Sequence, residues 1–153
     1  MVDQINHLIA SLALMRVGAV QVALPATDSV HTHMNFITFF GIKVTVYDDQ
    51  RLVLADVHAS RFLHFTVDDN DQIFKQAVPY TGEGPFLVLQ SSGTTGNPKF
   101  SLLTYKLARE RFEKYLHYQK ISQKDVFWTR SRLDFMSSKT RVLYSLMAGA
   151  GVC

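Results

Sequence analysis

Residues 1–47 alternate between helical and strand patterns, and this alternation constrains the fold more than any other feature of the sequence. Asp3 is a suitable helix N-cap, and apolar residues recur after it at helical spacing as far as Met15. Gly18 fits the left-handed position that ends a helix. The apolar run at 19–24, which a proline stops, then predicts a buried strand.

The same pattern occurs a second time in the next stretch of the chain. A helix is expected to begin after Asp28 or Ser29 and to end at Gly41. The β-branched run at 42–47 predicts the following strand. Because a strand, a helix and a strand follow one another, we expect the strands at 19–24 and 42–47 to pair in parallel through a right-handed crossover.

The remainder of the chain adds strands and two further helices. Strands are expected at 51–56, 61–67, 86–90, 100–103 and 126–128. The segment 105–116 has the pattern of an amphipathic helix, and Ser137 or Ser138 is a candidate cap for a last helix. On that helix, the residues expected to face the core are Val142, Leu143, Leu146 and Met147. The order of elements predicts an α/β fold, with a mostly parallel sheet flanked by helices.

The composition is that of a globular protein. The 153 residues are 47% hydrophobic and 19% charged, which fits a single α/β segment over 1–153. The net charge of +3 is too small to argue for nucleic acid as a partner. Cys153 is the one cysteine, so a reducing compartment is expected. The sequence shows neither a basic leader nor about 20 consecutive apolar residues, so we expect a cytoplasmic protein with no membrane span.

The segment Ser91–Lys99 carries the most informative pattern, Ser-Ser-Gly-Thr-Thr-Gly-Asn-Pro-Lys. Gly93 and Gly96 free the backbone for a close approach to a ligand. Lys99 adds one mobile cation. Hydroxyl groups come from Ser91, Ser92, Thr94 and Thr95. A loop of small donors with one cation, placed after a strand, is typical of polyphosphate binding.

Other motifs of similar composition do not fit this segment. In a Walker A loop the lysine follows the second glycine directly and a Ser or Thr comes next, whereas here Lys99 lies three residues beyond Gly96 and Phe100 follows it. The dinucleotide fingerprint requires G-x-G-x-x-G at the start of a helix, which is absent. A serine nucleophile in the pattern G-x-S-x-G is not expected either, because Ser92 lacks the preceding glycine.

These nine residues resemble the phosphate loop of the adenylate-forming enzymes, which include acyl-CoA synthetases, aryl-CoA ligases, luciferases and the adenylation domains of nonribosomal peptide synthetases. Every position matches the family pattern, and nine matches favour a phosphate loop over an ordinary flexible turn. The segments Leu14–Pro25 and Leu146–Val152 also look like family segments. Their order and rough spacing agree across nearly all of the chain.

The resemblance implies an AMP-forming acid–thiol ligase. In such enzymes a small carboxylic acid and ATP give an acyl-adenylate and pyrophosphate, and the thiol of coenzyme A or of a carrier pantetheine then accepts the acyl group. ATP and Mg²⁺ are therefore the expected cofactors. Thr94 or Thr95 would donate to phosphate oxygens or help to order Mg²⁺, and Lys99 would steady the loop or meet the leaving pyrophosphate.

The sequence also departs from the family. Most members have Gly-Val after the lysine, whereas Phe100 and Ser101 follow here. The adenine-contacting stretch, the ribose-binding aspartate and the C-terminal domain with its catalytic lysine have no counterpart. We therefore expect a fragment of the N-terminal AMP-binding domain, without a complete catalytic set and with little or no activity alone. Phe135 is a candidate for the acyl pocket, and plain core packing is at least as good an interpretation.

Two classes of function stay open at this point. The first is the ligase, with this chain as its phosphate-loop segment. The second is a noncatalytic or truncated nucleotide-binding remnant that acts as an interaction module, as a homodimer or with a complementary chain.

Other candidate sites carry less weight. His31 and His33 could hold a metal only with a third ligand, so solvent-exposed or capping histidines are the better interpretation. The acidic segment 68–71 lacks the glycine and the glutamate of a calcium loop and predicts a solvated turn. The basic residues between 106 and 124 predict a solvated helix face rather than a nucleic-acid site.

Overall fold

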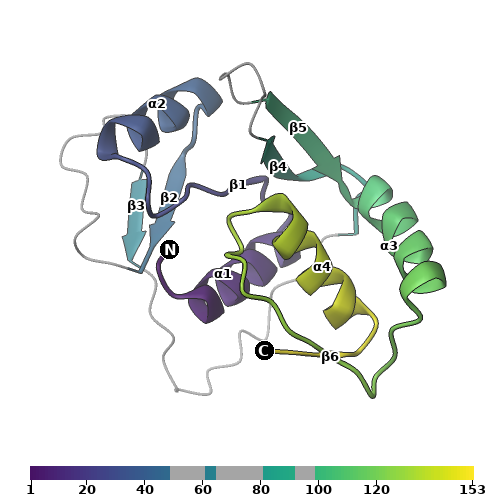
Figure 1. The fold of residues 1–153 in the computed structure, drawn as a ribbon. Helices are drawn as coiled ribbons and strands as arrows, with labels where there is room; N and C mark the ends of the chain where they lie inside the picture. Colours follow the sequence, from purple (N-terminus) through teal and green to yellow (C-terminus); the bar gives the residue numbers. More distant parts are fainter. Residues whose placement is uncertain (49–60, 65–80, 92–98) are drawn as a thin grey trace.

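A computed structural model of the chain describes residues 1–48, 61–64, 81–91 and 99–153 (Figure 1). The helices in these residues are α1 Gln4–Arg16, α2 Val30–Phe40, α3 Tyr105–Gln119 and α4 Met136–Met147. The strands are β1 Gln21–Val22, β2 Val44–Tyr47, β3 Arg61–His64, β4 Pro85–Ser91, β5 Lys99–Thr104, β6 Val126–Phe127 and β7 Gly151–Val152. The predicted α/β class is confirmed. The strand expected at 51–56 and the acidic segment at 68–71 lie outside the described residues.

Within the described residues the strands form three small sheets, in the orders β1-β4-β5, β2-β3 and β6-β7. Three of the four strand pairs are parallel, and β4 with β5 is antiparallel. The expected pairing of 19–24 with 42–47 is wrong, because β1 pairs with β4 and β2 pairs with β3. Chain order alone does not fix adjacency, since sequential strands are neighbours in only roughly two-thirds of cases.

Side-chain caps begin three of the helices. The Asn6 backbone N–H donates to Asp3 Oδ1 at 2.8 Å, as predicted for α1. Ser29 caps α2 and Thr104 caps α3 in the same way. Gly18 and Gly41 both have positive φ, which confirms their predicted left-handed positions at helix ends.

The first turn of α4 differs from the prediction. The helix begins at Met136, so Ser137 and Ser138 lie inside it rather than at its cap. Phe135 occupies the N-cap position, and no side chain caps the helix. Val142 and Leu143 are buried as expected, whereas Met147 is exposed and Leu146 is half-buried, because the buried face of α4 is rotated toward Ser138, Lys139 and Ser145.

The apolar spacing of α1 also does not coincide with its buried face. Ile5, Ile9 and Leu12 are exposed, whereas His7, Ala10 and Ser11 are buried. His7 Nε2 lies within hydrogen-bond distance of Lys139 Nζ of α4, and the Ser11 backbone carbonyl accepts from Gln21 of β1. The buried face of α1 therefore meets polar groups of α4 and β1 instead of the expected apolar ones.

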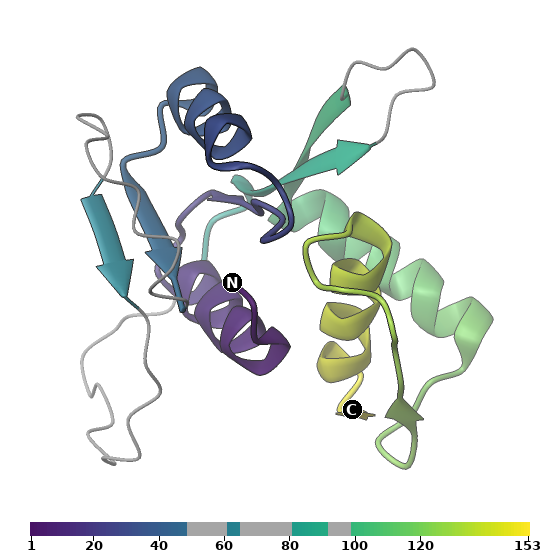
Figure 2. The same cartoon turned by 60° about the vertical axis from the view of Figure 1, so that its left-hand side comes forward.

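The main hydrophobic core lies where β4 and β5 meet α3 and α4. Figure 2 shows α3 and α4 on the same side of the fold as this strand pair. The buried residues of this core are Phe86, Leu87, Leu89, Leu103, Ala108 and Leu143. Tyr105 packs against it and its hydroxyl donates to the Met15 carbonyl at 2.7 Å, which ties α3 to the end of α1. Of the helices described, none is both long and apolar enough to cross a membrane.

Candidate functional site

The β4–β5 pair fixes both ends of the predicted phosphate loop. Ser91, the last residue of β4, lies opposite Lys99, the first residue of β5, in the antiparallel ladder. The two ends of the predicted loop therefore lie side by side at one end of this strand pair. The predicted site residues Ser92, Gly93, Thr94, Thr95 and Gly96 lie outside the described residues.

Phe100, where most adenylate-forming enzymes have a glycine, packs β5 against α2. Its ring centroid lies 5.7 Å from that of Phe36, 6.0 Å from that of Phe39 and 4.9 Å from that of Phe40. The contacts with Phe36 and Phe40 are edge-to-face, a favourable arrangement of aromatic rings. The departure at this position therefore provides packing that holds β5, and with it Lys99, against the helix.

The N-terminus of α4 lies beside the same end of β4. Gln90 of β4 and Phe135, Met136 and Lys139 of the α4 start line a recess of about 10 Å³. No side chain caps α4, and its dipole favours negative charge at this end, where the Asp134 carboxylate also lines the recess. Phe135 is 60% exposed, so plain core packing does not describe it. Its role in an acyl pocket stays a prediction.

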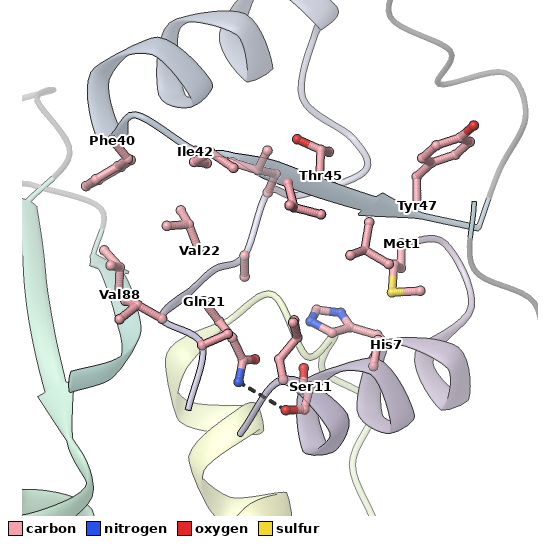
Figure 3. Close-up of a pocket in the computed structure, with 18 of the residues that line it drawn as sticks. Met1, His7, Ser11, Gln21, Val22, Phe40, Ile42, Thr45, Tyr47 and Val88 are labelled. Atoms are coloured by element: carbon pink, nitrogen blue, oxygen red, sulfur yellow. Dashed lines mark hydrogen bonds between the residues drawn. The ribbon is translucent and has the colours of Figure 1, made fainter. Parts of the chain in front are cut away.

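A buried polar cluster, which the sequence analysis did not identify, joins α4, α1 and β1. Lys139 is only 4% exposed. Its Nζ lies 3.3 Å from His7 Nε2 and 3.3 Å from Gln21 Oε1. Gln21 Nε2 in turn donates to the Ser11 carbonyl at 3.0 Å, as Figure 3 shows. The three side chains therefore form one connected network within the fold.

Burial shifts the ionisation of this network. It lowers the pKa of Lys139 to about 8, against a weaker opposing effect of Asp134. Burial and the neighbouring Lys139 charge lower the pKa of His7 to about 3. At neutral pH the cluster therefore holds a charged lysine and an uncharged histidine. A signal for it exists in the sequence, because Lys139 precedes the inward-facing Val142 and Leu143 by three and four residues.

The other candidate residues do not converge on a site. His33 is buried and its Nε2 lies 2.8 Å from the Pro25 carbonyl, so the expectation of an exposed or capping side chain is wrong for it. His31 is exposed. No group of three metal-ligating side chains occurs among the described residues. Exposed basic side chains cover α3, and Arg109 pairs with Glu83 at 3.5 Å.

Sequence comparison connects the chain with fungal synthetases. No family model matches it. It is 26% identical over 156 aligned residues to the hybrid PKS-NRPS synthetase pynA of Aspergillus niger. The alignment covers 97% of this chain and 4% of that synthetase, so the chain spans a small part of the relative's length.

Solved structures match the whole fold. ATP-bound MatB from Rhodopseudomonas palustris matches with a TM-score of 0.81 and 18% identity, over 98% of this chain and 33% of that one. MenE from Bacillus subtilis, in complex with ATP and magnesium ion, matches with a TM-score of 0.75 and 18% identity, over 98% of this chain and 32% of that one.

The N-terminal subdomain of Klebsiella oxytoca NpsA, in complex with 3-hydroxybenzoyl-AMSN, matches with a TM-score of 0.78 and 23% identity, over 96% of this chain and 37% of that one. These three neighbours are adenylate-forming enzymes, as the sequence analysis expected. The chain therefore has the fold of the N-terminal domain of the adenylate-forming enzymes, over about a third of the length of their solved chains.

Proposed function

We propose that this chain is the phosphate-loop part of an AMP-forming acid–thiol ligase, in which Ser91–Lys99 binds the phosphates of ATP. The observation that carries the proposal is the register of β4 and β5, which brings Ser91 and Lys99 opposite each other at the end of β4. The neighbouring Gln90 lines a recess together with the start of α4. A lysine cation and a helix N-terminus both favour an anion.

The reaction would be activation of a small carboxylic acid. A carboxylate oxygen attacks the α-phosphorus of ATP, the bond to the bridging oxygen breaks, and pyrophosphate leaves with that electron pair. The products are the acyl-adenylate and pyrophosphate, and a thiol of coenzyme A or of a carrier pantetheine would then take the acyl group. Since the acid is itself the nucleophile, the protein contributes mainly positioning and charge stabilisation.

The residues present fit parts of this task. Ser91, Ser92, Thr94 and Thr95 would donate to phosphate oxygens, and Mg²⁺ bound with ATP would neutralise phosphate charge. Gly93 and Gly96 would permit close approach of the backbone. Lys99 would meet the leaving pyrophosphate. The neighbours solved with ATP and with ATP and magnesium ion support this assignment. The proposed setting is the cytoplasm.

Calorimetric titration of the full chain with MgATP tests the proposal. We expect saturable binding that Lys99→Gln weakens about tenfold, because a charge-assisted contact is lost. Lys106→Gln, on the exposed face of α3, is the matched control and should leave the affinity unchanged. Absence of MgATP binding, or equal loss in both variants, would contradict the proposal.

The alternative is a noncatalytic remnant that acts as an interaction module, as a homodimer or with a complementary chain. The exposed apolar side chains Ile5, Ile9 and Leu12 of α1 favour it. An ATP–pyrophosphate exchange assay with a panel of carboxylic acids is expected to show no turnover by this chain alone. MgATP binding that depends on Lys99 would favour the ligase segment, and its absence would favour the remnant.

A further inference from the structure

Two strands from different sheets border a cavity of about 550 Å³, which separates β1 from β2 and has α1 along one side (Figure 3). In the described part of the chain, β4 is the strand neighbour of β1 and β3 is that of β2, so both strands are edge strands. An edge strand offers backbone N–H and C=O groups on its outer side to a further strand.

The lining residues show that the cavity meets both strands at their edges. Successive side chains of a strand point to opposite faces, so a cavity over one face alone would be lined by alternate residues. Every residue from 19 to 24 lines this cavity, and so does every residue from 41 to 47. One side of β1 is paired with β4 and one side of β2 with β3, so the cavity lies on the outer side of each strand.

Two helices complete the walls of the cavity. Ala10 and Leu14 of α1 line it, as do His33 and Phe40 of α2. Most of the remaining lining is apolar, and the side chains of the Lys139 cluster lie within hydrogen-bond distance of one another. A strand in this place would contact both helices. Strands that helices cover on both faces are typically uninterrupted apolar runs rather than alternating ones.

We propose that the cavity between β1 and β2 is a docking site for one extended apolar segment of a partner polypeptide, which adds a strand between them. Main-chain hydrogen bonds to the two edges would hold the segment, and its apolar side chains would contact the walls. A small molecule would fill the space but would not continue two strand ladders. The inference does not depend on phosphate binding, because neither Ser91 nor Lys99 lines the cavity.

The length of β2 sets the length of the partner segment. β2 has four residues. A matching strand of about four or five residues spans roughly 13–17 Å at the usual rise per residue. The expected partner therefore contains a short run of β-branched or other apolar residues without proline, since proline cannot donate to a ladder.

Calorimetry and amide hydrogen exchange of the full chain with a synthetic peptide test the site. The probe is an acetylated and amidated peptide of five valines between two pairs of lysines, which keep it soluble. We expect saturable binding, with slower exchange of backbone amides within 19–24 and within 42–47 and unchanged exchange in β5. The same peptide with N-methyl groups on alternate valines retains the apolar side chains but loses N–H donors, so it should bind at least about tenfold more weakly.

Two variants of the chain separate this site from other strand edges. Val44→Lys places a charge at the cavity edge of β2, which disfavours strand addition, and should weaken peptide binding about tenfold or more. Val44 is 45% exposed, so the fold should accommodate the lysine. Leu102→Lys is the matched control, because Leu102 is 52% exposed on β5, an edge strand in the described sheets that does not line the cavity. It should leave the affinity unchanged.

Three results would overturn the proposal. They are absence of peptide binding, equal affinity of the N-methylated peptide, and equal affinity of Val44→Lys and wild type. If protection of the two segments instead rises with protein concentration in the absence of peptide, the occupant is a second copy of the chain, and the assignment of a separate partner is wrong.

Discussion

The two sides of β4 are packed in different ways. Leu87 and Leu89 belong to a closed core with Leu103 of β5 and Leu143 of α4, whereas Val88, on the opposite face of the strand, lines the 550 Å³ cavity. The ladder with β5 extends from Pro85 to Ser91, but the ladder with β1 covers only two residues. Sustained strand pairing thus accompanies a packed apolar core, and the separation of β1 from β2 leaves a space lined by apolar walls and buried polar groups.

The largest effect is expected from a comparison of two leucines, one in the packed core and one at the cavity wall. Leu103→Ala should lower the free energy of unfolding by about 4 kcal/mol, because it removes a fully buried side chain and leaves a cavity. Leu24→Ala, at the wall of the existing cavity, should cost only about 1 kcal/mol, because no new void forms. Urea unfolding of both variants measures the difference. Equal losses would show that the two sides are equally packed.

The second prediction uses acid to destabilise the cavity side alone. The pKa of His7 is about 3 in the folded chain and 6.5 in the unfolded chain, so below pH 6.5 only the unfolded chain binds the proton. The free energy of unfolding should therefore fall by about 3 kcal/mol between pH 6.5 and pH 4.

Urea unfolding at several pH values, for wild type and for His7→Gln, isolates this effect from carboxylate titration. The glutamine retains an acceptor for Lys139 but cannot titrate, so the difference between the two curves should grow as the pH falls. Parallel curves would mean that His7 is not held neutral by the fold.

The third prediction concerns the buried charge. Lys139→Met should raise the free energy of unfolding at pH 7 by about 2 kcal/mol, because a methionine fills similar space without the desolvation penalty of an ammonium. Lys106→Met on α3 should change it by less than about 0.5 kcal/mol. Thermal melting of the two variants provides the comparison. A destabilised Lys139→Met would show that the hydrogen bonds to His7 and Gln21 outweigh the burial penalty.

The smallest effect on stability is expected from a comparison of two glycines with positive φ. A Cβ at Gly149, after α4, would lie 2.8 Å from Gln123 Cγ, whereas a Cβ at Gly41, beside the cavity, meets nothing within 4 Å. Gly41→Ala should cost about 1 kcal/mol from backbone strain alone, and Gly149→Ala should cost more because of the added contact. Equal melting temperatures of the two variants would exclude crowding on the α4 side.

Local signals in the sequence were sufficient for most elements. The caps at Asp3 and Ser29 and the left-handed glycines at 18 and 41 were predicted because each acts on its immediate backbone neighbours. Strand adjacency was not predictable in this way. Whether β2 pairs with β1 or with β3 depends on contacts between segments far apart in the chain.

The two candidate sites differ in the same way, since one is formed by consecutive residues and the other by residues far apart in the chain. The pattern at 91–99 could be recognised because its residues are consecutive, and the register of β4 and β5 then supplied the positions of its ends. The cluster of Lys139, His7 and Gln21 could not be recognised in the sequence, because its members are separated by up to 132 positions. They meet only when α1, β1 and α4 pack together. In a sequence, such a cluster is indicated only by polar residues within an apolar pattern, such as His7 in α1.

Phosphate binding at the end of β4 can be located by the backbone amide chemical shifts of the ¹⁵N-labelled full chain during titration with MgATP. We expect the shift changes to concentrate at Ser91, Lys99 and Phe135, while the shifts of His7 and Val44 at the cavity remain unchanged. Changes confined to the cavity residues, or no saturable change at either place, would contradict the assignment of phosphate binding to the end of β4.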